Sequence, residues 1–234
     1  MSNLHEVLYE QISRAKAPQD FDRALANYYK GCEVRIEKYV AMAKPKIDCC
    51  SGCNFCCYLR VGVRAHEIFL IANFVQERFT APQLNSLRQS LGEHVIKVGS
   101  LSPLEHQTRN SRCSLLEGQL CSVYKVRPFA CRAYHSNSVQ SCKHSFDNPT
   151  DISESRDQDE VIKDLWIRFA AYAHGVYMRL GYDSSHYELG TALSEALNNP
   201  HCRKRWRRGQ KAFLSCQSEG PSHPDWRNSA RQQM

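Results

Sequence analysis

The sequence predicts a mainly α-helical protein with one small, irregular, cysteine-rich segment that includes a β-hairpin. Apolar residues recur at three- and four-residue spacing along most of the chain, which is the pattern of amphipathic helices. Proline and glycine fall mainly at the ends of these stretches, where helices stop. Five of the twelve cysteines crowd into "CCSGCNFCC", Cys49 to Cys57, which is a poor core sequence.

The composition is that of an ordinary globular protein. At 234 residues, with 42% hydrophobic and 24% charged residues, the chain can bury a core without disulfides. The longest apolar run, "IFLIA", is too short to cross a bilayer, and the N-terminal "MSNLHEVLYEQISRAK" lacks the apolar centre of a secretory signal. We therefore expect a cytoplasmic location and no membrane partner. In a reducing compartment, clustered thiols indicate metal ligands or redox groups rather than disulfides.

The first half of the chain is expected to be helical on both sides of the cysteine-rich stretch. A helix over 20–43 ends before Pro45, and its apolar face repeats at helical spacing. That face consists of Phe21, Leu25, Tyr28, Cys32, Ile36 and Tyr39. Residues 58–63 alternate enough for a short strand, and 65–79 return to helical spacing. A helix over 80–99 has proline in its first turn and glycine at its end.

The second half combines a hairpin with two further helices. The stretch 113–124 predicts a small hairpin that turns at Glu117-Gly118. A polar, acidic loop over 147–160 then opens a helix over 159–180, and another helix is expected over 185–197. The last 15 residues are expected to be disordered.

Eight cysteines fall into two spaced sets, and this predicts metal ligation. Structural zinc takes four thiolate or imidazole ligands, and iron–sulfur clusters commonly take four cysteines. Eight thiolates therefore suit two four-ligand sites, or one cluster and a remainder. The expected ligands are Cys49, Cys53, Cys56, Cys57, Cys113, Cys121, Cys131 and Cys142.

The remaining cysteines have other expected roles. Cys50 is undecided, whereas Cys32, Cys202 and Cys216 stand alone and are expected to pack as small hydrophobes. Among the ligands, Cys56 and Cys57 are adjacent, and neighbouring side chains on extended backbone point to opposite sides. The pair is therefore expected to serve two sites, or to place one thiolate as a bridge between two metals.

Two known patterns share these spacings. The run Cys49-x3-Cys53-x2-Cys56 has the spacing of the radical-SAM iron–sulfur loop, but that family continues as alternating strands and helices, whereas this chain continues as helix. A better match is the combination of "CCSGCNFCC", "VGVRAHE" and "CSVYKVRPFACRAY". It resembles the zinc- or iron-chelating CxxCxxCC family, the YkgJ-like cysteine-cluster proteins, from about Cys49 to Cys142. The resemblance implies metal binding by the same eight cysteines.

Two arginines near the second cysteine set are candidate cofactor-binding residues. Pro128 is expected to fix the turn that brings Cys131 back toward Cys121, and Arg127 and Arg132 flank that turn. Their N–H groups are expected to bond backbone carbonyls or ligand sulfurs.

The positive charge is concentrated at the C-terminus. Residues 200–234 hold eight Lys and Arg against two Asp and Glu, a net of +6, which leaves +1 of the total +7 for the rest. The run "RKRWRRGQK" could bind phosphates, with Trp206 stacking on a base. We favour instead a helix end whose Trp206 and Phe213 dock on the body, because one short basic run is not a nucleic-acid-binding module.

These observations divide the chain into four expected segments. An N-terminal helical segment (1–45) precedes a cysteine-cluster metal-binding core (46–146). Helices of 147–200 pack on that core, and 201–234 form a basic, partly disordered tail.

Three functions stay open for this arrangement. The first is a protein whose ions, zinc or an iron–sulfur cluster, organise a binding surface, since a fully thiolate-ligated zinc has no open coordination position. The second is an iron–sulfur redox or protein-modifying enzyme, because a related cysteine pattern occurs in flagellin lysine methylases and suggests lysine methyl transfer. The third is a nucleic-acid-associated protein that uses the tail.

Overall fold

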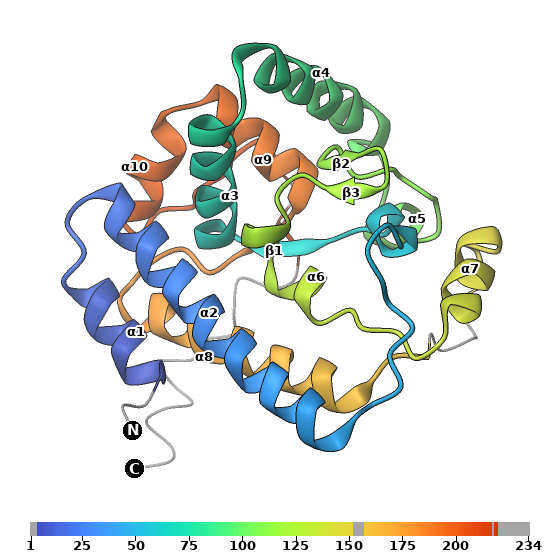
Figure 1. The fold of residues 1–234 in the computed structure, drawn as a ribbon. Helices are drawn as coiled ribbons and strands as arrows, with labels where there is room; N and C mark the ends of the chain where they lie inside the picture. Colours follow the sequence, from blue (N-terminus) through green and yellow to red (C-terminus); the bar gives the residue numbers. More distant parts are fainter. Residues whose placement is uncertain (1–3, 152–156, 217, 220–234) are drawn as a thin grey trace, which may run out of the picture.

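The computed structural model describes residues 4–151, 157–216 and 218–219, and it is mainly helical (Figure 1). The helices are α1 (Leu4–Ser13), α2 (Pro18–Ala43), α3 (Ala65–Arg78), α4 (Ala81–Val98), α5 (Pro103–Gln107), α6 (Phe129–Arg132), α7 (Val139–Asp147), α8 (Glu160–Arg179), α9 (Leu189–Asn198) and α10 (His201–Arg207). The short 3-10 helices are η1 (Phe55–Tyr58) and η2 (Tyr124–Val126). The strands are β1 (Gly62–Arg64), β2 (Leu116–Glu117), β3 (Leu120–Cys121), β4 (His186–Glu188) and β5 (Ser218–Glu219).

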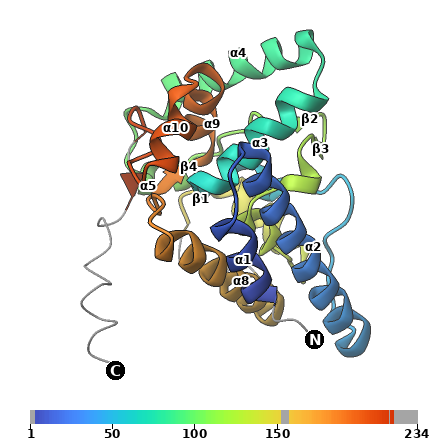
Figure 2. The same ribbon diagram turned by 90° about the vertical axis from the view of Figure 1, so that its left-hand side faces the viewer.

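The larger helices form two groups that share one hydrophobic core. Helices α1, α2 and α8 pack together, while α9 packs on α3, α4 and α10. Contact between α2 and α3 joins the groups, and a 90° turn shows the same division (Figure 2). The hairpin, α5 and α7 lie on the side away from α1 and α10 (Figure 1). None of the described helices is both long enough and apolar enough to span a membrane.

The longest helices form where the sequence predicts them, and their ends have local causes. Five of the six residues on the predicted face of α2 are buried, all but Tyr39. Helix α2 ends when Lys44 adopts a left-handed conformation, φ 46°, just before Pro45. Helix α4 begins where the backbone N–H of Thr80 donates to Gln83 Oε1 at 2.9 Å. Helix α8 begins at a second cap, because Asp159 Oδ1 accepts from the Ile162 N–H at 2.8 Å.

Two small antiparallel sheets interrupt the helices. In the larger, β4 lies between β1 and β5, and Val63 of β1 faces Tyr187 of β4. In the smaller, β2 and β3 form the predicted hairpin, with Leu116 opposite Cys121. Gly118 turns the hairpin with φ +59°, a conformation that glycine adopts without strain.

Two sequence-based boundaries were wrong. The strand expected over 58–63 is shorter and begins later, because Phe55–Tyr58 form η1. The helix expected from residue 185 begins only at Leu189, because the preceding residues, His186–Glu188, pair with β1. Helical periodicity does not register such pairing with a distant strand. Part of the acidic loop, 152–156, and the last 15 residues lie outside the described residues.

The basic segment after residue 200 is docked on the body as far as it is described. Trp206 and Phe213 are 1% and 0% exposed, and the ring of Trp206 stacks on Tyr182 with centroids 4.7 Å apart. Arg203 forms an ion pair with Asp22 of α2 at 3.0 Å, and Arg205 pairs with Glu195 at 3.0 Å. These internal contacts favour the docked helix over the nucleic-acid interpretation.

Candidate metal centre

Backbone hydrogen bonds bring the two cysteine-bearing runs together. The Cys113 N–H donates to the Cys57 carbonyl at 2.8 Å, and the Ser111 N–H donates to the Tyr58 carbonyl at 3.2 Å. The segment that leads into the hairpin therefore lies along η1. Two runs more than fifty residues apart in the sequence meet in the fold.

The first cysteine loop also contacts the segment that leads into α7. The Asp48 N–H donates to the Ser136 carbonyl at 2.9 Å, and the Ser136 N–H donates to Cys49 Sγ at 3.2 Å. Phe146 of α7 packs on Phe55 and Tyr58 of η1, with ring centroids 5.6 and 4.9 Å apart. Helix α7 carries Cys142, so this packing places that residue beside the first loop.

The first thiol set consists of Cys49, Cys53, Cys56 and Cys142, whose thiols interact electrostatically. Burial, and then repulsion from Cys49, Cys142 and Cys56, raises the pKa of Cys53. Burial likewise raises the pKa of Cys49, with further repulsion from Cys142 and Cys56. Such repulsion indicates that these thiols share one neighbourhood of the fold.

The second thiol set consists of Cys56, Cys113, Cys121 and Cys131. Burial, and then repulsion from Cys113, Cys56 and Cys121, raises the pKa of Cys131. Burial also raises the pKa of Cys113, to about 12, with repulsion from Cys121. Cys56 belongs to both sets, and its contact with the Cys57 thiol, followed by burial, raises its own pKa.

Arg127 supplies positive charge beside both thiol sets. Its guanidinium carbon lies 4.1 Å from the centroid of the Tyr124 ring. Its charge opposes the rise in the pKa of Cys49, Cys121 and Cys131, because a cation favours a thiolate. The contacts of Arg127 thus agree with a position near the expected ligands.

Arg132 has other partners. It is 1% exposed, and its Nε and Nη2 atoms donate to the carbonyls of Arg127 and Lys125 at 2.8 and 2.7 Å. Nη1 pairs with Glu33, and the guanidinium lies 4.2 Å from the centroid of the Tyr29 ring. Arg132 therefore holds the chain between the two cysteines of the "CSVYKVRPFACRAY" motif in its turn.

Glu67 positions the start of α6. Its Oε1 atom accepts from the Phe129 N–H at 2.8 Å and from the Tyr29 hydroxyl at 3.2 Å. Its Oε2 atom accepts from the Arg64 N–H at 2.9 Å. A buried carboxyl group satisfied in this way is a structural group. It fixes the short helix that carries Cys131.

The donor chemistry fits zinc or iron, whereas the spacing of the sulfurs is wider than in a closed site. Thiolates are ligands of zinc and of iron–sulfur clusters. With zinc–sulfur bonds of about 2.3 Å, a tetrahedral site places sulfurs about 3.8 Å apart. Within the described part of the chain, the cysteine sulfurs form no group of three within 4.8 Å of one another. Closing such a site requires side-chain rotation, and Cys49, at least, is exposed enough to rotate.

The cysteines that are not expected ligands differ in burial. Cys32, Cys202 and Cys216 are buried, as expected for packed residues, and Cys50 is exposed. Burial raises the pKa of Cys32 and of Cys216 to about 12, so these thiols are protonated at neutral pH.

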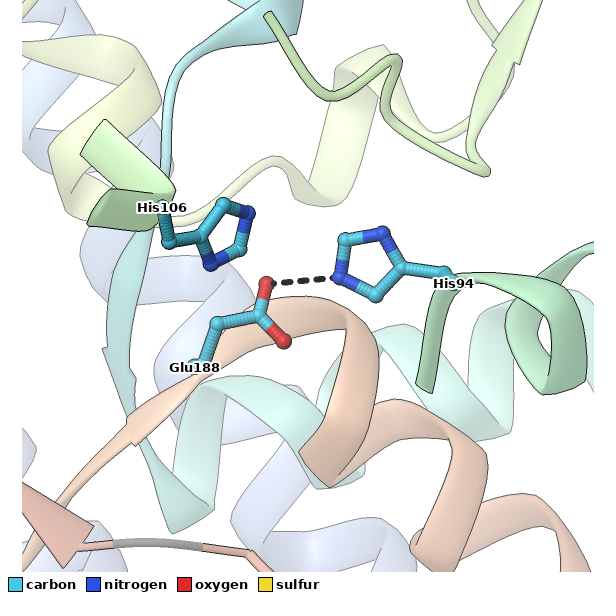
Figure 3. Close-up of side chains that lie close together, drawn as sticks. All are labelled: His94, His106 and Glu188. Atoms are coloured by element: carbon cyan, nitrogen blue, oxygen red, sulfur yellow. Dashed lines mark ion pairs between the residues drawn. The ribbon is translucent and has the colours of Figure 1, made fainter. Parts of the chain in front are cut away.

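Sequence reasoning missed a second group of donors. His94, His106 and Glu188 come from three separate elements and lie within 4.8 Å of one another in the interior (Figure 3). No short motif contains them, because 94 residues separate the first from the last. Only the tertiary contacts of α4, α5 and β4 reveal them.

These features define a helical protein in which a cysteine-rich segment gathers soft metal donors beside a shared core. Residues 49–158 match the model of the CxxCxxCC family, described as "Putative zinc- or iron-chelating domain". The resemblance seen in the sequence is confirmed, and the match supports zinc or iron chelation by this segment. The comparison with curated proteins found no match, and neither did the comparison with solved structures.

Proposed function

We propose that this protein chelates zinc or iron through two adjacent groups of four thiolates that share the Cys56–Cys57 pair as a common wall. One group combines Cys49, Cys53 and Cys142 with one cysteine of the pair, and the other combines Cys113, Cys121 and Cys131 with its neighbour. The observation that carries the proposal is the double membership of Cys56, whose thiol interacts electrostatically with Cys49 of one set and Cys131 of the other. The family match supports the metal itself.

The surrounding charges suit such a centre. Four thiolates around one divalent ion leave about two negative charges for each group. Arg127 lies beside both sets and offsets part of that charge. We infer a supporting role for Arg132, which sets the turn between Cys121 and Cys131 rather than reaching the metal. A bound ion would supply the positive charge that keeps the ligand thiols deprotonated.

A cytoplasmic location completes the proposal. All twelve cysteines are free thiols, including the crowded ones. Reducing compartments keep such thiols available for metal, whereas secreted proteins pair them as disulfides.

A second candidate function, an iron–sulfur redox or protein-modifying enzyme, is favoured by an open groove beside Cys121. The groove has a volume of about 520 Å³, and Phe74, Phe79, Tyr124 and Lys125 are among the residues that line it. A groove of this size next to the thiols can receive a side chain of another protein, as lysine methyl transfer would require.

The test is the metal content of protein purified without oxygen. We expect stoichiometric zinc, or iron with acid-labile sulfide and a brown colour, in the unaltered chain. Cys53→Ser and Cys131→Ser each remove a ligand from one group and should lower the metal content. Cys50→Ser is the matched control, because this exposed neighbour lies outside both groups and its loss should leave the content unchanged.

The outcomes separate the candidates. Zinc without colour contradicts the iron–sulfur enzyme, and iron with sulfide contradicts structural zinc. Anaerobic protein that holds no transition metal refutes the proposal altogether.

A further inference from the structure

A compact group of three metal-binding side chains lies apart from the thiol sets. His94 projects from α4, His106 from α5, and Glu188 from the junction of β4 and α9, and all three point toward one another (Figure 3). Their ligand atoms lie within 4.8 Å of one another, and His94 Nε2 is 3.2 Å from Glu188 Oε1. The side chains of His94 and Glu188 are 9% and 11% exposed, and His106 is 4% exposed.

The backbone around α9 holds two of these groups in place. Glu188 caps the helix, since its Oε1 and Oε2 atoms accept from the N–H groups of Gly190 and Thr191 at 3.0 and 2.7 Å. Gly190 leaves room for the imidazole of His94, because a Cβ atom at this position would lie 2.4 Å from the ring. The backbone of α9 thus fixes the Glu188 carboxylate and leaves space beside it for the His94 imidazole.

Two polar groups at this point are buried. His94 Nε2 has Glu188 Oε1 as its ion-pair partner at 3.2 Å. Ser111 Oγ, on the wall of the same small cavity, is also buried, and it makes no hydrogen bond. A buried hydroxyl without a partner is costly, and a water molecule held in the cavity by a cation would satisfy it.

The cavity has room for one ligand beyond the protein side chains. Its volume is about 20 Å³, and His94, His106, Glu188, Ser111 and Cys113 line part of its wall. A water molecule needs at least about 10–15 Å³ of such space. The cavity therefore suits a four-coordinate ion that keeps one water, and it is too small for an ion that needs three further ligands.

The positive charges of Arg60 and Lys97 lie near His106. An ion at this point would therefore be held by coordination bonds rather than by net charge.

We propose that His94, His106 and Glu188 bind a zinc ion, with a water molecule in the adjoining cavity as the fourth ligand. Two imidazoles and one carboxylate are an established donor set for zinc with one open position, whereas calcium and magnesium prefer oxygen ligands only. This site differs from the thiol groups in its ligands, and Cys113 on the cavity wall makes it their neighbour.

Zinc counting and X-ray absorption test the assignment. Protein purified anaerobically is equilibrated with Zn²⁺, and its zinc content and zinc K-edge spectrum are measured. We expect nitrogen or oxygen neighbours at about 2.0–2.1 Å from zinc, resolved from sulfur at about 2.3 Å. His94→Gln and His106→Gln should each lower the content by one zinc per chain and remove the shorter shell. His174→Gln is the control, because this buried imidazole pairs with His66 instead.

Gly190→Ala tests the same site without removing a ligand. The added Cβ displaces the His94 ring, and we expect zinc affinity to fall about 10–100-fold, as for other changes that misorient a ligand. Glu188→Gln retains an oxygen acceptor for the cap of α9. Circular dichroism of this variant checks that a loss of zinc affinity does not come from misfolding.

The two proposals fail in different ways. Cys131→Ser should change the sulfur shell and leave the shorter shell intact. An unaltered zinc count in folded His94→Gln and His106→Gln, or a wild-type spectrum with sulfur neighbours alone, overturns the histidine site. In that case, His94 and Glu188 form only an ion pair.

Discussion

Replacing Arg132 with methionine should destabilise the protein strongly, because the buried guanidinium satisfies several groups at once. Arg132→Met keeps a similar apolar volume but removes every donor. The carbonyls of Lys125 and Arg127 lose their partners, and the ring of Tyr29 loses the cation that lies 4.2 Å from its centroid.

The magnitude follows from these contacts. Each carbonyl that loses its donor costs up to about 1–3 kcal/mol, the lower end applying where water replaces the guanidinium. A desolvated cation–π contact adds about 1–2 kcal/mol. The pair with Glu33 adds little, because that carboxylate is 43% exposed and water replaces the arginine. The free energy of unfolding should therefore fall by about 3–5 kcal/mol, since such contributions do not add fully.

Urea unfolding followed by circular dichroism measures this change, with both proteins at the same metal loading. Arg168→Met is the matched control, because its side chain is 69% exposed and its pair with Asp164 is worth only about 0.3–0.5 kcal/mol. A loss below about 1 kcal/mol for Arg132→Met, similar to the control, refutes the view that this residue holds the turn.

Two further predictions concern stability. Trp206→Ala should lower the free energy of unfolding by about 3–5 kcal/mol in urea, because the ring is 1% exposed. The control Leu214→Ala, at a residue 64% exposed, should change it by less than about 0.5 kcal/mol. Equal losses in the two variants contradict the docking of α10. Burial, and then the charges of Arg64 and His186, lowers the pKa of His174 to about 3, below its ordinary 6.5. The unfolded chain therefore binds more protons, and the free energy of unfolding should drop by up to about 1.4 kcal/mol per pH unit as pH falls from about 6.5 toward 3. His174→Gln should make that slope shallower, and an unchanged slope counts against a buried neutral ring.

Local patterns sufficed for the long helices. The face of α2 and the cap of α4 are encoded in residues three or four positions apart, so periodicity and capping rules find them. The start of α9 was missed because His186–Glu188 pair with β1, more than a hundred residues earlier. Strand pairing over such a distance leaves no periodic trace in either segment.

The two candidate sites also differ in whether the local sequence reveals them. Crowded thiols are visible as a motif, so the eight cysteines could be nominated from spacing alone, and their ligand roles stay a prediction. Which sulfurs are neighbours depends on α7 folding back onto η1, which no spacing rule contains. The group of His94, His106 and Glu188 arises entirely from tertiary contacts and could not be nominated.

The pairing of β1 with β4 has a practical consequence for anyone who wishes to isolate the metal-binding part. Strand β1 lies within residues 49–158, but its hydrogen-bonding partner lies outside that stretch. An excised fragment with those ends would expose the backbone edge of Gly62–Arg64 and the apolar side of α3 that α9 covers. Unpaired edges of this kind promote aggregation, so the cysteine segment should be produced together with its flanking helices.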